Sequence, residues 1–339
     1  MIQERLKALR AEMEKRGITV YVVPTADFHE SEYVGDHFKA RKFITGFTGS
    51  AGTAVITLDE AGLWTDGRYF VQAENQLKDS TVTLYRMGEE SVPTVDEFVK
   101  DRLKEGGCLG FDGRVVNGTW GGKLEKIAAE KNVSMHVTED LIDLIWEDRP
   151  ALSKQPLFIL EEKYSGKSTA DKIADLRKAM KENGADVHIL TSLYDIAWLL
   201  NIRGNDIDYV PVVLSYLVLN ETECIWFLQE EVVDDKIRAY LEENHITTKP
   251  YDAIYDYVPE IPADAVVLMN RGTVNYRIVN SLDKAIKVVD KPNPTELMKA
   301  VKNKTEVDNT RAAHVKDGVA FTKFMYWLKT NIGKIPMTE

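Results

Sequence analysis

An internal repeat constrains the fold of this chain more than any other feature. Residues 5–23 (RLKALRAEMEKRGITVYVV) and residues 172–190 (KIADLRKAMKENGADVHIL) carry the same pattern at one constant offset. The aligned pairs are Leu6/Ile173, Leu9/Leu176, Arg10/Arg177, Met13/Met180, Gly17/Gly184, Val20/Val187 and Val22/Ile189. Apolar residues at helical spacing predict a helix, the glycine predicts its end, and the alternating residues that follow predict a strand. We therefore expect two copies of one α/β unit.

The repeat continues more loosely into pairs of strands. Residues 53–58 and 63–65 form such a pair in the first copy, and residues 212–219 and 224–228 form one in the second. Helices and hairpins both connect the strands. We therefore predict an α/β fold in which each copy is a mixed β-sheet flanked by helices, not a purely parallel sheet.

Composition suggests where the chain divides. Residues 150–156 (PALSKQP) have the composition of a linker, so we place one domain at 1–155 and a second at 156–293. Residues 294–339 then read as helical. Thr305 is expected to cap a long helix ending at Thr330, whose apolar residues share one face.

Local patterns predict further details. Thr94 and Glu97 have the spacing of a capping box. Residues 39–42 (KARK) are expected to form a solvated basic surface, and both cysteines, Cys108 and Cys224, are expected to be buried. Additional helices are predicted over residues 69–77, 124–130 and 139–146.

Charge and composition exclude several classes of protein. The formal net charge is -11, and no run of Lys and Arg is present, which argues against nucleic-acid binding. No apolar stretch is long enough for a membrane span, and the charged N-terminus does not resemble a signal peptide. Two distant cysteines fit a reducing compartment, so we expect a cytoplasmic protein.

Arg68 is the one residue for which we predict a functional role. It follows Asp66-Gly67, a turn dipeptide in which glycine could supply positive φ, and it precedes a predicted helix. A guanidinium held at such a corner could bind a peptide carbonyl or carboxylate through its planar fork. The alternative is an internal salt bridge to Asp66.

Other candidate sites are weaker. The six histidines form no H-x-x-x-H or C-x-x-C arrangement, so we predict no metal site and no catalytic residue in this chain. Ser50 lies in GSAG, but Thr48 breaks the G-x-S-x-G motif. Asp206 and Asp208 are expected to be loop or cap residues, and His188 to be buried in a strand.

Several motifs resemble those of X-Pro aminopeptidases (aminopeptidase P), within the creatinase, prolidase and methionine aminopeptidase superfamily. The similar stretches, in order, are HESEY, TGFTGSAGTAVIT, WTDGRYF, IWEDRP, DIAWLLNIRG and KAVKN…AHVKDGVA. The resemblance implies two creatinase N-terminal-like domains followed by the opening helices of a catalytic domain of pita-bread fold.

The resemblance also implies an activity for the parent protein. Such an enzyme removes the N-terminal residue preceding proline from short peptides, using two divalent metals, typically Mn²⁺. The metal ligands of the family (two Asp, one His, two Glu) are expected beyond position 339, so this chain alone is expected to be truncated and inactive. Its two domains would shape the cleft, restrict access and support a homodimer, with Arg68 reaching the substrate.

Two other interpretations remain open. A stand-alone module that binds a peptide or protein without hydrolysis would resemble the domains in the large subunit of the FACT histone chaperone. A creatinase or prolidase shares the fold but fits the TGSAGT and WTDGRYF stretches less well.

Overall fold

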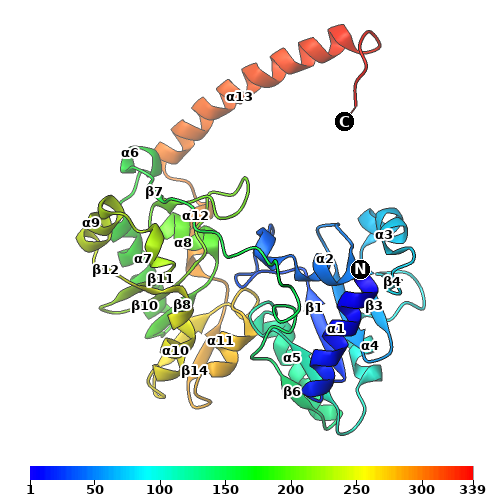
Figure 1. The fold of residues 1–339 in the computed structure, drawn as a ribbon. Coiled ribbons are helices and arrows are strands. Elements are labelled where there is room, and N and C mark those ends of the chain that lie inside the picture. Colours follow the sequence, from blue (N-terminus) through cyan, green and yellow to red (C-terminus); the bar gives the residue numbers. More distant parts are fainter. Residues whose placement is uncertain (339) are drawn as a thin grey trace.

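The computed structural model describes residues 1–338, which form two α/β units side by side and a projecting C-terminal helix (Figure 1). In the first unit, the strands are β1 Val20–Pro24, β2 Thr53–Thr57, β3 Ala61–Thr65, β4 Thr83–Arg86, β5 Cys108–Phe111 and β6 Ser134–His136. Its helices are α1 Ile2–Lys15, α2 Ala40–Thr45, α3 Phe70–Leu77, α4 Val95–Arg102 and α5 Gly118–Glu130, with 3-10 turns η1 Asp36–Phe38 and η2 Gly67–Tyr69.

The second unit repeats this plan and adds a small two-stranded sheet. Its strands are β7 Phe158–Ile159, β8 Val187–Leu190, β9 Ile202–Arg203, β10 Ser215–Asn220, β11 Cys224–Leu228, β12 Ile246–Pro250, β13 Val266–Met269 and β14 Lys287–Asp290. Its helices are α6 Glu162–Ser165, α7 Thr169–Glu182, α8 Leu193–Leu199, α9 Asp235–Glu243, α10 Ile254–Tyr257, α11 Tyr276–Ser281, α12 Pro294–Ala300 and α13 Lys304–Asn331. The 3-10 turns are η3 Glu230–Val232, η4 Tyr251–Ala253 and η5 Val258–Glu260.

The topology of the two sheets confirms the internal repeat. The strand orders are β4-β3-β2-β1-β5-β6 and β12-β11-β10-β8-β13-β14, which are the same order at equivalent positions. In both sheets the central strand pairs antiparallel on one side and parallel on the other, as β1 does with β2 and β5. The predicted mixed sheet flanked by helices is therefore confirmed.

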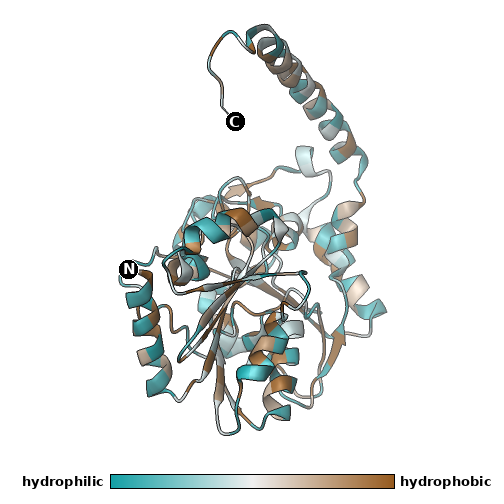
Figure 2. Cartoon of the chain, turned by 90° about the vertical axis from the view of Figure 1, so that its right-hand side faces the viewer, coloured by the Kyte–Doolittle hydropathy of each residue, from teal (hydrophilic) through white to brown (hydrophobic). Residues whose placement is uncertain are grey.

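Each sheet is buried on both faces, which explains its runs of apolar residues. Along β1, Tyr21 and Val23 face one core, together with Leu9 of α1, while Val20 and Val22 face another. This alternation is the period-two pattern of a strand. Figure 2 shows the hydrophobic colour gathered in the central strands, with hydrophilic residues on the outer helices. Within residues 1–338, no helix is both long and apolar enough to span a membrane.

Sequence patterns missed the outermost strands of the second sheet. β12 and β14 lie at its two edges, and their sequences, ITTKP and KVVD, mix polar with apolar residues. Edge strands carry fewer buried side chains, so their periodicity is weak.

Several predicted helix boundaries are wrong. The helix predicted over residues 139–146 is absent: residues 141–145 form turns, and the Asp140 carboxylate accepts a hydrogen bond from the backbone N–H of Ile142. The cap of α13 is Asn303, which forms a capping box with Glu306, and Thr305 already lies inside the helix. The capping box of Thr94 and Glu97 is present as predicted.

A near-twofold arrangement of backbone hydrogen bonds joins the two units. The N–H of Gly118 donates to Val274 (2.8 Å), and the N–H of Tyr276 donates to Val116 (2.7 Å). A second reciprocal pair runs from Thr119 to Arg271 and from Arg277 to Gly113.

The centre of this junction is a bridge between Asn117 and Asn275, the N-cap residues of α5 and α11. Equivalent residues of the two copies therefore contact one another, as in an isologous dimer interface.

Candidate functional site

A large cavity lies between the two units, beside the linker that joins them. Its volume is about 740 Å³, within the range of ligand sites in proteins. The first unit contributes residues 32–42 and the loop Thr48–Ser50, and the second contributes residues 205–209. The loops before β2 and β10, which are related by the repeat, thus face one another across it.

The loop that carries HESEY crosses from the first unit into the second. Asp27 shapes it by accepting hydrogen bonds from the backbone N–H groups of His29 and Ser31, both at 2.9 Å. Glu30 has φ of 55°, a left-handed conformation that is uncommon outside glycine. The side chain of Asn117 donates to Glu30, which ties this turn to the cap of α5.

His29 fixes this loop inside the second unit. Its Nδ1 donates to the carbonyl oxygen of Thr191 (3.1 Å), and its Nε2 lies 2.6 Å from the hydroxyl of Tyr251. The ring is also tilted against Tyr216, with centroids 4.5 Å apart. Burial lowers the pKa of His29 to about 4, so the imidazole is neutral at pH 7.

Arg41 fixes the loop that precedes β2, which contains Gly46, Gly49 and Gly52. Its guanidinium donates to the hydroxyl of Thr25 (2.9 Å), to the carbonyl of Phe47 (2.5 Å) and to the carbonyl of Gly49. Burial lowers the pKa of Arg41 to about 10. The expectation that residues 39–42 form a solvated basic surface is therefore wrong for Arg41, because its donors satisfy carbonyls that the loop cannot pair internally.

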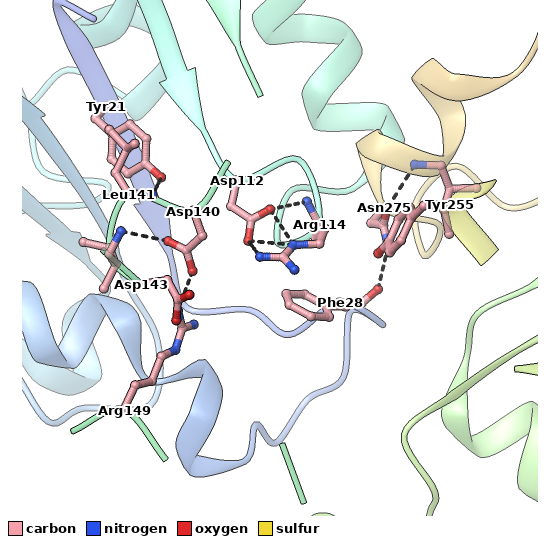
Figure 3. Close-up of polar contacts among 12 residues, drawn as sticks. Tyr21, Phe28, Asp112, Arg114, Asp140, Leu141, Asp143, Arg149, Tyr255 and Asn275 are labelled. Atoms are coloured by element: carbon pink, nitrogen blue, oxygen red, sulfur yellow. Dashed lines mark hydrogen bonds and ion pairs between the residues drawn. The ribbon is translucent and has the colours of Figure 1, made fainter. Parts of the chain in front are cut away.

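A buried ionic network lies next to the cavity in the first unit (Figure 3). Arg114 forms a bidentate ion pair with Asp112, in which Nε donates to Oδ1 (3.0 Å) and Nη2 donates to Oδ2 (3.0 Å). Arg149 donates to Asp140 at 2.6 Å. Burial, and then the neighbouring charge of Asp112, raise the pKa of Asp140.

The network reaches the second unit through Phe28. Its ring lies under the Arg114 guanidinium, at 4.4 Å from the centroid, and its carbonyl accepts from Asn275 (3.0 Å). Asn275 also donates to Tyr255 (3.2 Å). Burial lowers the pKa of Arg114, but Asp112 raises it by more, so this arginine stays charged. These contacts tie the first unit to the second.

Charges are distributed unequally over the cavity walls. The first unit contributes Lys39 and Lys42 at the start of α2, and Lys39 pairs with Asp36. The second unit contributes Asp206 and Asp208. Asp206 is buried and accepts from the N–H groups of residues 155 and 214, so its role is structural as predicted, whereas Asp208 is exposed.

Arg68 lies at the corner between β3 and α3 and is exposed, with 69% of its side chain accessible. It forms a bidentate ion pair with Asp66, in which Nε donates to Oδ1 (2.8 Å) and Nη2 donates to Oδ2 (2.9 Å). The turn prediction allowed for a positive φ at Gly67, but Gly67 does not adopt one. It begins η2, which Asp66 caps by accepting from the N–H of Arg68. The predicted alternative, a salt bridge to Asp66, is present, and substrate binding by Arg68 stays a prediction.

For the remaining candidate residues, the observed contacts indicate a structural role. His188 is buried, and its Nδ1 donates to the carbonyl of Leu268 (2.9 Å). The hydroxyl of Ser50 lies 2.6 Å from that of Tyr69, with no histidine among its hydrogen-bond partners. Both cysteines are buried and free, as expected. Within residues 1–338, no three His, Cys, Asp or Glu side chains are placed to hold a metal ion.

Sequence patterns did not identify His29 or Arg41 as residues that shape the cavity. Both contact groups far away in the chain, such as Thr191 and Tyr251 for His29. The only available signals were the histidine in a polar loop and an arginine on a short helix, and neither type of position predicts burial.

Comparison with known proteins identifies the two units. The family model described as the creatinase/prolidase N-terminal domain matches residues 5–145, and a second model with the same description matches residues 148–306. The chain is 38% identical over 342 residues to a protein of Neurospora crassa named "Probable Xaa-Pro aminopeptidase P", covering 97% of this chain. A protein of the same name in Laccaria bicolor is 38% identical over 347 residues.

A solved structure agrees over nearly the whole chain. The X-prolyl aminopeptidase of Caenorhabditis elegans, described as a cytosolic enzyme with a di-nuclear active site, matches with a TM-score of 0.91 and 31% identity over 98% of this chain. The match covers 56% of that enzyme, and 50% and 52% of the two curated relatives. The chain thus spans about half the length of the relatives it matches. It belongs to the creatinase/prolidase family, whose N-terminal domain it carries twice in tandem.

Proposed function

We propose that this chain is the N-terminal part of a metal-dependent X-Pro aminopeptidase, which releases the residue preceding proline from short peptides. The observation that carries the proposal is the likeness to the C. elegans enzyme over 98% of the chain, at a TM-score of 0.91. The relatives are about twice as long as the matched region, which leaves room in the parent protein for a separate catalytic domain.

The residues described here do not form the metal site of such an enzyme. No suitable group of ligands occurs among residues 1–338, and the histidines with the most buried rings, His29 and His188, already bind backbone carbonyls. In the proposed parent enzyme, two divalent metals, Mn²⁺ by our proposal, would be held by the second half. This chain alone would therefore be inactive.

We assign to this chain the wall of the cleft and the support of the catalytic domain. α13 carries exposed apolar residues along its length, including Val315, Val319, Phe324 and Trp327, which are 47% to 69% exposed. Such a stripe needs a covering surface, and we propose that the catalytic domain supplies it. Restriction to short peptides, a homodimeric assembly and a cytoplasmic location complete the proposal.

Mass and activity of the native gene product test this function. We expect a product longer than 339 residues that cleaves X-Pro peptides, loses activity with a chelator and recovers it with Mn²⁺. The 339-residue chain should show no turnover under the same conditions. A native product of 339 residues without activity would overturn the proposal and favour a stand-alone peptide- or protein-binding module.

A further inference from the structure

We propose that the cavity between the two units binds short peptides and recognises their C-terminal carboxylate through Lys42 and Lys39. The inference rests on the proposed function for its ligand class, since an X-Pro aminopeptidase acts on peptides. It adds a recognition site built entirely from residues of this chain.

The wall formed by α2 offers a cation that has no internal partner. Lys42 lines the cavity and forms no ion pair within residues 1–338, whereas Lys39 pairs with Asp36. Arg41, between them, donates to the carbonyls of Phe47 and Gly49 and to the Thr25 hydroxyl. Lys42 is therefore available to a ligand anion.

Asp36 shows that this wall already favours a carboxylate. Its side chain accepts a hydrogen bond from Lys39. That hydrogen bond, followed by the charge of Lys39 and with a smaller effect of Lys42, lowers the pKa of Asp36. A second carboxylate, supplied by a ligand, would meet the same two ammonium groups.

The opposite wall orients the ligand. Asp208, which the second unit contributes, is exposed, lines the cavity and has no ion-pair partner among the described residues. A ligand carboxylate is repelled from this wall and attracted to Lys42. Backbone N–H groups of a peptide can face the acidic side, so a dipolar chain fits better than a simple anion.

The size and rim of the cavity fit a few residues of peptide. A volume of about 740 Å³ exceeds what a single amino acid needs. Tyr33 and Tyr209 line it from the two units, and both side chains are exposed, at 57% and 104%. Aromatic rings at the rim offer apolar contact to a proline ring while leaving their hydroxyls in water.

Titration of this chain with the tripeptide Ala-Pro-Ala and with its C-terminal amide tests the assignment, by calorimetry or NMR at low salt. We expect the acid to bind about five-fold more tightly than the amide, which corresponds to one partly exposed ion pair. Lys42→Met should abolish this preference, because it removes the cation. Since Lys42 is exposed, the substitution should not disturb the core. Lys7→Met, an exposed lysine of α1 outside the cavity, should leave it intact.

Three results would overturn the proposal: no binding at millimolar peptide, equal binding of acid and amide, or an undiminished preference in Lys42→Met that melts like the wild type. The assay needs neither metal nor turnover. Failure of the aminopeptidase proposal would appear in the native product, and failure of carboxylate recognition would appear only here, so the two are distinguishable.

Discussion

The ion pair with Asp66 positions the Arg68 guanidinium and leaves some of its N–H groups available to a ligand. Its Nε and Nη2 are used by Asp66, whereas Nη1 makes no hydrogen bond within the described residues. The pair fixes the plane of the guanidinium at the corner before α3. The N–H groups of Nη1 can then point to a substrate without much loss of side-chain entropy.

Arg68→Ala in the complete enzyme should lower kcat/KM roughly ten-fold, the cost of losing one hydrogen bond to a charged donor. The melting temperature should stay the same, since exposed ion pairs contribute little to stability. Arg86→Ala removes another surface arginine paired with a carboxylate, Glu74, and serves as the control. Equal kinetics for Arg68→Ala and the wild type would rule out the substrate role.

Buried His29 makes the stability of the protein dependent on pH. Its pKa is about 4 in the folded chain and about 6.5 when unfolded, so the folded state binds the proton more weakly. The stability contributed by neutral His29 is complete above pH 6.5 and is lost as the pH falls toward 4. The loss should reach about 3 kcal/mol, since one pKa unit corresponds to about 1.4 kcal/mol.

Urea unfolding of the wild type and of His29→Gln from pH 7 to pH 4 measures this term. The variant should be less stable at pH 7 but should lose less stability on acidification. Burial lowers the pKa of His188 as well, and the difference between the two proteins removes that shared contribution. Parallel pH profiles would mean that His29 is not the group responsible.

At the scale of elements, α13 differs from every other helix in the chain. Its first turns contact α6, where Asn303 donates to Ser165 and Asn309 donates to Tyr164. Beyond these contacts it extends away from the body (Figure 1), and none of its residues is buried. Helices in water owe most of their stability to tertiary packing, which this one lacks over most of its length.

Hydrogen exchange of this chain should therefore separate α13 from the core. Amides of residues 312–330 should exchange much faster than those of β8, which lies in the middle of the second sheet. In the complete enzyme the same amides should become protected. Protection of α13 in the isolated, monomeric chain would contradict an unpaired helix.

At the scale of the whole molecule, the two units are joined by the contact of α5 with α11. The side chain of Tyr276 packs directly on Gly121, where an added Cβ would lie 2.1 Å from the ring. The neighbouring Gly122 has open space around its Cα. These two glycines of one helix provide a matched pair for testing the junction.

Gly121→Ala should destabilise the protein by about 1–3 kcal/mol, since the methyl group must displace Tyr276. Gly122→Ala should stabilise it by up to about 1 kcal/mol through helix propensity alone. Thermal or urea unfolding measures both. Similar effects of the two substitutions would show that Tyr276 accommodates the added methyl group without cost.

Features that depend on local pattern could be predicted from the sequence. The helix-glycine-strand repeat, the alternation along β1 and the capping box of Thr94 and Glu97 follow from periodicity and from short-range hydrogen bonds. Motifs such as HESEY and WTDGRYF also led to the correct family. The domain boundary at residue 155 and the role of Arg68 stay predictions.

Contacts between residues far apart in the chain could not be predicted in this way. Arg41 became a buried anchor, His29 entered the second unit, and Asn117 came to bridge Asn275, because each contact joins groups whose spacing in the chain carries no signal. Edge strands β12 and β14 gained their order from pairing with a neighbour, not from their own composition. The cavity likewise exists only because two equivalent loops, far apart in sequence, face one another.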